Sequence, residues 1–464
     1  MRPFHILALA LALAGPALAQ EAWFPPFDDC EAQAMRILDE ATQTVDIAQY
    51  NIRSERFLGK LVELQQRGVR VRICVDKKNA DKDYNTLDDA MQAAGLDLLR
   101  VLNDRSDFAI MHHKFTVVDG RTVMTGSYNW NETAQEVNEE NILVLRDPAL
   151  AAAYTREFEE LRGAPEVAQV GQGANVTVYF SPEDNARQAV LDQINRAQRR
   201  IVVCMFTYKD DRIARAMRDA ARRGVDVTLI VEKKQADTTS SDEIVVSGGV
   251  NAKVHVVANV SSPFSAMHEK FGVFDDARVI TGACNWTRTA FDFSNEDLLV
   301  IQDAALAARY TAAAGDILAR YVPAAFDPAR FGIDRPDVRA HVVVRCGSTR
   351  PGDSVVIVGS DPALGAWDPT RGVPLRTNES LFPTWAGRFV LPKGADVHWK
   401  AVVLQADGSV RWEIGDDRVV STSPQGAAWA TIVDFREDPA VPTPPPAPPA
   451  PPTGGGLVGG IPGQ

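Results

Sequence analysis

The nine residues MHHKFTVVD at positions 111–119 return, slightly changed, as MHEKFGVFD at positions 267–275. Each copy is followed by a second short pattern, TGSYNW at 125–130 and TGACNW at 281–286. Both copies obey one rule, H-x-K-x4-D-x6-G-x2-N. Because five fixed positions at fixed spacing are very improbable by chance in two places, the two stretches must share a cause.

The repeat extends beyond the motif at one constant spacing. GVRV at 68–71 aligns with GVDV at 224–227, and His112 aligns with His268 (224 − 68 = 156; 268 − 112 = 156). A solenoid needs several shorter units that stack on one another, so two long units do not fit that architecture. The duplication predicts two packed lobes related by approximate twofold symmetry, with a shared site that receives one motif from each lobe.

Each unit alternates segments that are typical of helices and strands. In the first unit, candidate helices lie at 31–41 and 54–67, and candidate strands lie at 45–50, 69–75 and 98–102. Such βα alternation is typical of a mostly parallel sheet covered by helices. The predicted fold class is α/β, with two duplicated lobes that have mixed sheets flanked by helices. Lobe 1 is expected at 22–170 and lobe 2 at 171–325.

After the second unit, the sequence no longer alternates helix-like and strand-like segments. A linker is expected at 326–337, and 338–437 contains short alternating apolar runs separated by glycine and proline turns. That pattern predicts a C-terminal all-β, immunoglobulin-like sandwich. The last residues, 438–464, are rich in proline and then in glycine, which predicts a disordered tail.

The first 19 residues have the features of a secretory signal peptide: a short cationic start, an apolar run at 6–13 and small residues at Ala17 and Ala19. We therefore expect a secreted protein, periplasmic or extracellular. No later segment reaches the roughly 20 apolar residues that cross a bilayer, so no stable membrane span is expected. The five cysteines are an odd number, and Cys74 and Cys204 lie in apolar strand-like runs where a buried thiol is expected.

The formal net charge of −12 gives the whole molecule no attraction for nucleic acid or anionic lipid. A local basic groove stays open as an alternative to ordinary solvated basic pairs. Its candidate residues are Arg199, Arg200, Arg222, Arg223, Lys233 and Lys234.

Two histidines and two lysines that converge can cleave a phosphodiester. Lys114 and Lys270 would neutralise the non-bridging oxygens as the transition state forms. One imidazole, with an ordinary pKa of about 6.5, would attack phosphorus in its neutral form, and the other, protonated, would give its proton to the leaving alcohol. Water would then hydrolyse the phosphohistidine. This chemistry requires no metal and no cofactor.

Polar residues near each motif fit supporting roles. Asn129 and Asn285, with the Ser127 hydroxyl, would donate hydrogen bonds to phosphate oxygens or hold the site in place. Glu140 and Glu296 each lie eleven residues beyond an asparagine (140 − 129; 296 − 285). Each glutamate would accept a hydrogen bond from the second ring nitrogen of a histidine and so fix the tautomer of that ring.

The motif aspartates, Asp119 and Asp275, follow an apolar strand-like run. At a strand end, a carboxylate that stabilises a turn or forms a salt bridge is expected more often than a chemically active one. As members of the motif they still belong to the candidate catalytic set, which is His112, Lys114, Asp119, Asn129, His268, Lys270, Asp275 and Asn285.

Over roughly 30–321 the chain resembles the phospholipase D superfamily, whose signature is H-x-K-x4-D followed by G-S/G-x-N, twice per active site. The resemblance implies a two-lobe α/β fold and a metal-independent phosphodiesterase with a phosphohistidine intermediate. It also implies that the amino-terminal histidine, His112, is the nucleophile and that His268 is the general acid and base. Ala283 departs from the pattern, because it stands where the first copy has Ser127.

The run G-S-D-P-x-L-G-x-W-D-P, with the later W-K and R-W-E, resembles the starch-binding modules of carbohydrate-binding family 20 across roughly 338–437. By this resemblance Trp367 and Trp412 form one glucan platform, with Lys400 and Glu413 beside it. Trp385 matches an aromatic residue of a second site. Taken singly, each tryptophan is about equally compatible with a place in the core of a small sandwich.

The leading hypothesis is a secreted phosphodiesterase that hydrolyses the distal phosphodiester bond of phospholipids and binds an α-glucan such as starch or glycogen. The first alternative is a secreted nuclease of the same superfamily, against which the acidic balance counts. The second alternative is a glycan-binding protein with a vestigial catalytic half, although both motifs keep their histidine and lysine.

Overall fold

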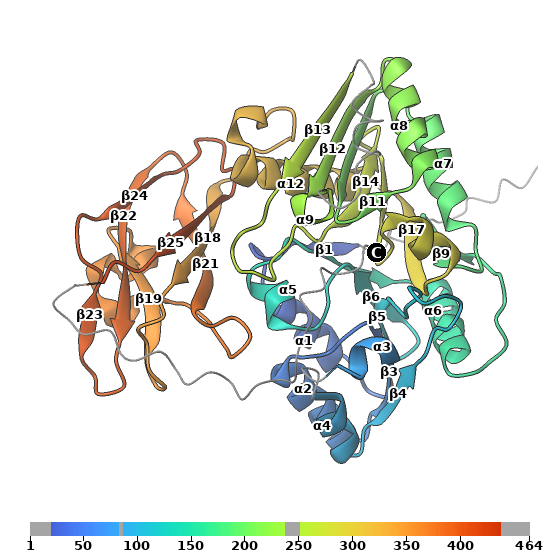
Figure 1. The fold of residues 1–464 in the computed structure, drawn as a ribbon, viewed down its shortest axis with the longest axis horizontal. Coiled ribbons are helices and arrows are strands. Elements are labelled where there is room, and N and C mark those ends of the chain that lie inside the picture. The colour runs from blue at the N-terminus through green and yellow to red at the C-terminus, as the bar shows by residue number, and fades with distance from the viewer. Residues whose placement is uncertain (1–19, 83–86, 237–250, 438–464) are drawn as a thin grey trace, which may run out of the picture.

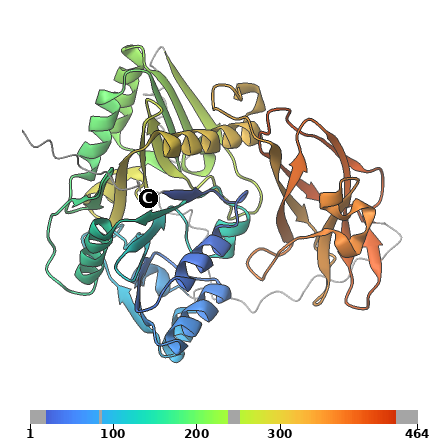
Figure 2. The same ribbon diagram turned by 180° about the vertical axis from the view of Figure 1, so that it is seen from behind.

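The computed structural model describes residues 20–82, 87–236 and 251–437 (Figures 1 and 2). The predicted signal peptide and the predicted disordered tail lie outside the described residues. Two α/β lobes pack against each other, and a β-sandwich lies beside them, drawn in orange in Figure 1. Within the described residues, no helix is long and apolar enough to cross a membrane.

Lobe 1 is built on a seven-stranded sheet of order β1-β7-β6-β5-β2-β3-β4. Its strands are β1 (Glu21–Trp23), β2 (Thr44–Gln49), β3 (Arg70–Asp76), β4 (Asp97–Val101), β5 (Lys114–Val118), β6 (Thr122–Gly126) and β7 (Ile142–Arg146). Only β2, β3 and β4 pair in parallel, because helical crossovers join them. The strand β5 instead turns back into β6 at 119–121 and pairs with it antiparallel. The sheet is therefore mixed, which confirms the predicted fold class, although the βα alternation alone had indicated mostly parallel pairing.

The helices of lobe 1 begin where the sequence supplies a capping side chain. Asp29 accepts a hydrogen bond from the Ala32 amide at the start of the first helix, and Asp147 caps the long helix that follows β7. The helices are α1 (Cys30–Asp39), α2 (Glu55–Gln66), α3 (Lys77–Ala80), α4 (Leu87–Ala93), α5 (Glu132–Glu136) and α6 (Pro148–Leu161). The sequence placed α1 and α2 to within two residues at each end.

Lobe 2 repeats this plan in an eight-stranded sheet of order β13-β12-β10-β14-β15-β17-β9-β8. Its strands are β8 (Gly171–Gln172), β9 (Val176–Ser181), β10 (Arg200–Met205), β12 (Asp226–Glu232), β13 (Ala252–Val257), β14 (Lys270–Phe274), β15 (Arg278–Gly282) and β17 (Glu296–Gln302), with a separate pair β11 (Tyr208–Lys209) and β16 (Trp286–Thr287). Its helices are α7 (Ala186–Arg196), α8 (Asp211–Arg222), α9 (Lys233–Ala236), α11 (Arg288–Asp292) and α12 (Ala304–Tyr321).

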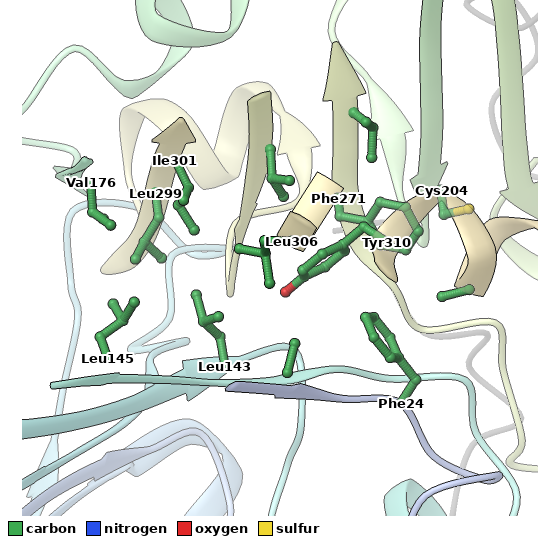
Figure 3. Close-up of a cluster of buried hydrophobic side chains, with 14 of the residues drawn as sticks. Phe24, Leu143, Leu145, Val176, Cys204, Phe271, Leu299, Ile301, Leu306 and Tyr310 are labelled. Carbon is green, nitrogen blue, oxygen red and sulfur yellow. The ribbon is translucent and has the colours of Figure 1, made fainter. Parts of the chain in front are cut away.

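One apolar core joins the two lobes (Figure 3). Leu143 on β7 points from lobe 1 toward Leu299 on β17 of lobe 2. The Tyr310 ring of α12 lies between Phe24 and Phe271, with 5.0 Å between ring centroids on each side. Because each large apolar side chain that is fully buried contributes about 1.5–3 kcal/mol, this shared core holds the lobes as one unit.

The predicted linker at 326–337 is a packed segment rather than a spacer. Phe331 and Ile333 are buried against α12, and the contact requires a glycine on the helix. A β-carbon at Gly315 would lie 2.6 Å from the Phe331 side chain. Arg330 also donates a hydrogen bond to Asp226 at 2.8 Å, which ties the segment to lobe 2.

The C-terminal region is the predicted sandwich of two sheets. A three-stranded sheet, β21-β18-β25, faces a five-stranded sheet in which β20, β19, β22 and β23 are neighbours and β24 pairs with β22. The strands are β18 (Asp337–Arg345), β19 (Ser354–Gly359), β20 (Val373–Pro374), β21 (Thr384–Pro392), β22 (Asp396–Leu404), β23 (Val410–Trp412), β24 (Arg418–Ser421) and β25 (Trp429–Asp434).

The three-stranded sheet docks on the lobes through buried polar contacts. Asp316 of α12 is 2% exposed and accepts from Arg335 at 2.8 Å and from Arg339 at 2.6 Å. His341 Nε2 donates to the Glu136 carbonyl at 2.8 Å, and Arg388 donates to the Glu136 carboxylate at 2.8 Å. Buried ion pairs of this kind need a fixed geometry, so the sandwich holds one orientation on the lobes.

Candidate active site

The two motifs meet at the boundary between the lobes. The lysine of each motif begins a central strand, β5 or β14, and the histidine precedes it by two residues. The His112 amide donates to the Asn295 carbonyl, and the His268 amide donates to the Glu139 carbonyl, each at 2.9 Å. Because both hydrogen bonds cross between lobes, the main chain itself brings the two histidines to one place.

Each histidine is oriented by a glutamate of the other lobe. His112 Nδ1 lies 2.8 Å from Glu296 Oε2, and His268 Nδ1 lies 2.8 Å from Glu140 Oε2. The hydrogen bonds predicted for the glutamates are therefore present, but each one crosses to the opposite lobe. With Nδ1 occupied, Nε2 is the ring nitrogen that is left for a substrate.

The two lysines are buried beside the histidines. Lys114 Nζ donates to the His112 carbonyl and Lys270 Nζ to the His268 carbonyl, each at 2.7 Å. Burial lowers the pKa of Lys114 to about 8 and that of Lys270 to about 7. An anion bound between them would offset the cost of their buried charges, so the site is suited to a phosphate group.

Burial also lowers the pKa of both histidines, and the nearby lysines lower it further. The pKa of His112 lies well below its ordinary value, and that of His268 falls to about 4. Both rings are therefore neutral at pH 7 before an anion binds. The Glu140 carboxylate raises the pKa of His268 against this trend, whereas burial raises the pKa of Glu296 itself. The two histidines are thus placed in unequal surroundings.

The side chains of Asn129, Asn285 and Ser127 differ in their hydrogen-bond partners. Asn129 Oδ1 is buried and has no hydrogen-bond partner among the described residues, whereas Asn285 Oδ1 accepts from the Thr207 amide at 3.3 Å. Ser127 Oγ accepts from the Asn141 amide at 2.9 Å. The serine hydroxyl therefore holds the start of β7 in place.

The glycine that both copies of the second pattern share is required for a steric reason. Gly126 has a φ of 138°, and a β-carbon there would lie 2.3 Å from the Asn141 carbonyl oxygen. Likewise, a β-carbon at Gly282 would lie 2.4 Å from the Asp297 carbonyl oxygen. No residue with a side chain fits between these strands without displacing the segment that carries the glutamates.

The motif aspartates lie at the opposite ends of β5 and β14 from the lysines. Asp119 Oδ1 accepts from the amides of Gln43 and Thr44, each at 2.8 Å. Asp275 Oδ1 accepts from the Arg199 amide at 2.8 Å. These carboxylates stabilise turns, as their position in the sequence indicated. Their inclusion in the catalytic set is corrected, because they do not reach the site.

A buried second layer that the sequence analysis missed lies behind the histidines. In lobe 1, His113 Nε2 lies 2.7 Å from Glu157 Oε1, and His113 Nδ1 lies 3.8 Å from Asp297 Oδ1. Burial lowers the pKa of His113, but the nearby Asp297 carboxylate and the hydrogen bond with Glu157 outweigh burial and raise the pKa to about 9. The pKa of Asp297 is lowered by the same contact with His113, although burial opposes this. His113 is therefore a buried cation.

Lobe 2 has no such cation at the equivalent place. Glu269 stands 156 residues after His113 (269 − 113), and Asn141 stands 156 residues before Asp297 (297 − 141). Asn141 Nδ2 donates to Glu269 Oε2 at 2.5 Å, and burial raises the pKa of Glu269 well above its ordinary value. The repeat offset was the signal that could have exposed this asymmetry.

The structure places two of the predicted glucan-binding tryptophans on one outer face of the sandwich. Trp412 is 39% exposed and lies opposite Val402 across β22 and β23. Trp367 is half-buried and packs on the cluster that contains Val402. Lys400 Nζ donates to the Gly415 carbonyl at 2.7 Å beside this face.

Two other predicted glucan contacts are structural instead. Trp385 is 7% exposed, belongs to the core of the sandwich, and donates from Nε1 to the Cys346 carbonyl at 3.3 Å. Glu413 is 1% exposed and pairs with Arg418 at 2.8 Å and with Arg436 at 3.0 Å. Because buried side chains cannot meet a sugar ring, both assignments are corrected.

Among the described residues, neither the cysteines nor a cluster of metal ligands adds a further chemical centre. All five cysteines lie within the described residues and are buried free thiols. In the ranges 20–82, 87–236 and 251–437, no group of three or more His, Cys, Asp or Glu side chains is arranged to hold a metal ion.

Two models of known protein families match this chain. The model described as "Cardiolipin synthase, PLD-like domain" matches 35–162 and 190–316, which are 128 and 127 of the 464 residues. The model described as "Starch binding domain" matches 338–432. The first matches fall in the two lobes, and the second falls in the sandwich.

Among known proteins, the chain is similar to a mitochondrial cardiolipin hydrolase from Chlamydomonas reinhardtii, with 38% identity over 124 residues, 27% of this chain and 53% of the relative. It is also similar to a phospholipase D from Rickettsia prowazekii, with 27% identity over 138 residues, 29% of this chain and 63% of the relative. The chain thus spans between half and two thirds of these relatives. A solved phospholipase D family member, Nuc from Salmonella typhimurium, shows 24% identity over 31% of this chain and 93% of that chain, with a TM-score of 0.29.

The raised pKa of His113 predicts a specific dependence of stability on pH. A rise from an ordinary value near 6.5 to about 9 corresponds to roughly 3 kcal/mol of folding free energy. Because the folded-state pKa is the higher one, this contribution is complete below about pH 6.5 and is lost as pH rises through 9. The free energy of unfolding of the wild type should therefore exceed that of His113→Gln by an amount that shrinks across this range, as measured by urea denaturation.

The matched control is His398→Gln, which replaces an exposed histidine on β22 of the sandwich, away from the site, and should keep the wild-type profile. A constant difference between wild type and His113→Gln from pH 6.5 to 9 would show that His113 is not a buried cation.

Proposed function

Since this chain belongs to the cardiolipin synthase type of phospholipase D-like proteins and carries a starch-binding domain, we propose that it is a phosphodiesterase that hydrolyses phospholipids. The observation that supports this most strongly is the pair of cross-lobe hydrogen bonds between His112 and Glu296 and between His268 and Glu140, each 2.8 Å long. They leave two Nε2 atoms and two lysines for one phosphodiester, which is the set of groups that the displacement needs.

In the first step of the proposed reaction, His112 Nε2 donates its lone pair to phosphorus. The bond between phosphorus and the leaving alcohol breaks, and His268 gives the leaving oxygen a proton from Nε2. In the second step, water attacks the phosphohistidine, His268 accepts the proton, and the bond between phosphorus and His112 breaks. Lys114 and Lys270 balance the charge on the phosphoryl oxygens throughout.

The unequal surroundings support this division of roles. Burial lowers the pKa of His112 most, and Lys114 and Lys270 lower it further, which favours the neutral form that a nucleophile requires. Burial lowers the pKa of His268 to about 4, although the Glu140 carboxylate opposes this. A bound phosphodiester anion raises this pKa, so that His268 can hold the proton that the leaving alcohol takes.

Lipid is favoured over nucleic acid by the contacts that the basic residues make. The net charge of −12 opposes anionic lipid as well as nucleic acid and does not decide between them. Two candidates for a basic groove are engaged elsewhere: Lys234 donates to the Ser265 carbonyl at 2.5 Å, and the Arg200 guanidinium lies 5.2 Å from the Phe331 ring centroid. The named relatives that act on cardiolipin support the same choice.

Two further parts of the proposal concern location. The predicted signal peptide at 1–19 supports secretion, and the face that carries Trp367 and Trp412 supports attachment to an α-glucan. Because the sandwich is docked rigidly on the lobes, a bound glucan would hold the phosphodiesterase at a fixed orientation to its surface.

The proposed mechanism predicts that His112→Ala and His268→Ala each lower lipid hydrolysis by about 10³-fold or more, because neither half-reaction proceeds without its proton carrier or nucleophile. The assay is head-group release from phosphatidylcholine and cardiolipin vesicles in EDTA, with plasmid DNA tested in parallel. His255→Ala, on β13 away from the site, is the control that should keep full activity.

The two variants should also differ from each other. With bis(p-nitrophenyl) phosphate, whose leaving group needs no proton, His268→Ala should accumulate a covalent phosphoryl adduct detectable by mass spectrometry, and His112→Ala should not. The reverse pattern would exchange the roles, and loss of activity in EDTA would refute metal independence. Cleavage of DNA without lipid hydrolysis would favour the nuclease, and silence on all diesters would favour the glycan-binding alternative.

The glucan platform predicts that Trp367→Ala and Trp412→Ala each weaken amylose binding by about tenfold, since an aromatic contact of this kind is worth on the order of 1.5 kcal/mol. Affinity electrophoresis in amylose gels measures the change, and hydrolysis of a soluble diester should stay unchanged. Val390→Ala removes an exposed apolar side chain from the other sheet and serves as the control. Undiminished amylose binding after both tryptophans are replaced would place the platform elsewhere.

A further inference from the structure

Two large apolar side chains are exposed at equivalent positions of the two lobes. Phe108 is 56% exposed and Phe264 is 75% exposed. They are 156 residues apart (264 − 108), and each precedes its motif histidine by four residues (112 − 108; 268 − 264). The duplicated fold therefore presents one exposed phenyl ring beside each histidine.

The loops that carry these rings are each held in place by a lysine side chain. Lys78 Nζ donates to the carbonyl oxygens of Ser106 and Ala109, at 3.1 and 2.7 Å. Lys234, the equivalent lysine of lobe 2, donates to the Pro263 and Ser265 carbonyl oxygens at 3.1 and 2.5 Å. Each ring thus stands on a loop whose backbone is fixed, rather than on one that can fold the ring into the core.

Both loops are also tied to the opposite lobe, next to the glutamates of the site. Asn103 Nδ2 donates to the Phe293 carbonyl and to Asn295 Oδ1, each at 2.8 Å. Asn259 Nδ2 donates to the Val137 carbonyl at 2.7 Å and to Glu139 Oε2 at 2.9 Å. Asn295 and Glu139 directly precede Glu296 and Glu140, so the two loops flank the shared site.

The chemistry of the loops fits an apolar partner. The segment 258–267 contains no charged residue and exposes Val260, Pro263 and Phe264. In lobe 1, Leu102 is 53% exposed in the same loop as Phe108, although Asp104 and Asp107 of that loop are exposed as well. The nearest lysines spend their donors on carbonyl oxygens, so they are not directed at phosphates. A nucleic-acid surface would need free cations here, whereas a lipid surface needs exposed apolar side chains.

We propose that Phe108 and Phe264 form a lipid-docking pair: both rings enter the acyl region of a lipid surface and bring the headgroup phosphate to the two histidines between them. This inference rests on the proposed function and names where its substrate is presented. Exposed apolar residues at the rim of a site are typical of contact with a membrane or another apolar partner. The uncharged loop of lobe 2 would make the larger contribution.

The experiment compares wild type with Phe108→Ser, Phe264→Ser and the double variant. Binding is measured by flotation with vesicles of phosphatidylcholine and cardiolipin, and catalysis is measured on bis(p-nitrophenyl) phosphate, which is soluble. Each single change should weaken vesicle binding by about tenfold and the double change by more, because each removes an apolar side chain from a lipid environment. Hydrolysis of the soluble diester should stay within about twofold of wild type.

Val419→Ser is the matched control, because Val419 is 54% exposed but lies on the sandwich. Vesicle binding that persists in the double variant, or soluble-diester hydrolysis that falls in parallel with it, would overturn the proposal. Loss of DNA binding with unchanged vesicle binding would overturn it in favour of base stacking. Vesicle binding that depends on both rings, without hydrolysis of any lipid, would support the docking pair while refuting the proposed substrate.

Discussion

The two hydrogen bonds between a histidine of one lobe and a glutamate of the other are the constraint on which the rest of the structure depends. Each is 2.8 Å long and buried at the lobe boundary. Neither lobe can orient its own histidine, so the lobes must meet in one register. The shared apolar core and the crossing main-chain bonds from His112 and His268 supply that register. Buried polar partners of this kind are costly if they are misaligned, which makes the arrangement specific.

Symmetry brings the groups together, and departures from symmetry separate their roles. His113, whose pKa is raised to about 9, is buried behind one histidine, whereas Glu269, a buried acid whose pKa burial raises, lies behind the other. A phosphohistidine mechanism requires one neutral and one protonated imidazole at the same pH. Burial lowers the pKa of both imidazoles, and Glu140, which opposes this at His268, favours that ring as the proton carrier.

Local sequence patterns predicted local structure well. They failed where contact with a residue distant in the sequence determines the structure. The first two helices, the strands of the sandwich and the existence of a shared site followed from periodicity and from the 156-residue offset. The offset identifies equivalent residues but not which glutamate meets which histidine, because pairing within or between lobes satisfies the same spacing. A strand-like run does not show the direction of its neighbour, so the pairing of the individual strands within each mixed sheet could not be predicted. Trp385 and Glu413 resemble ligand contacts in sequence, yet burial decides their role.

The central claim is that two half-sites form one anion site within a single chain. The most direct test is isothermal titration calorimetry of the intact protein with inorganic phosphate, with the oligomeric state measured in the same buffer. The account predicts that one phosphate binds per chain and that His112→Ala or His268→Ala weakens this single event. Two phosphates per chain, or one phosphate for every two chains, would contradict it.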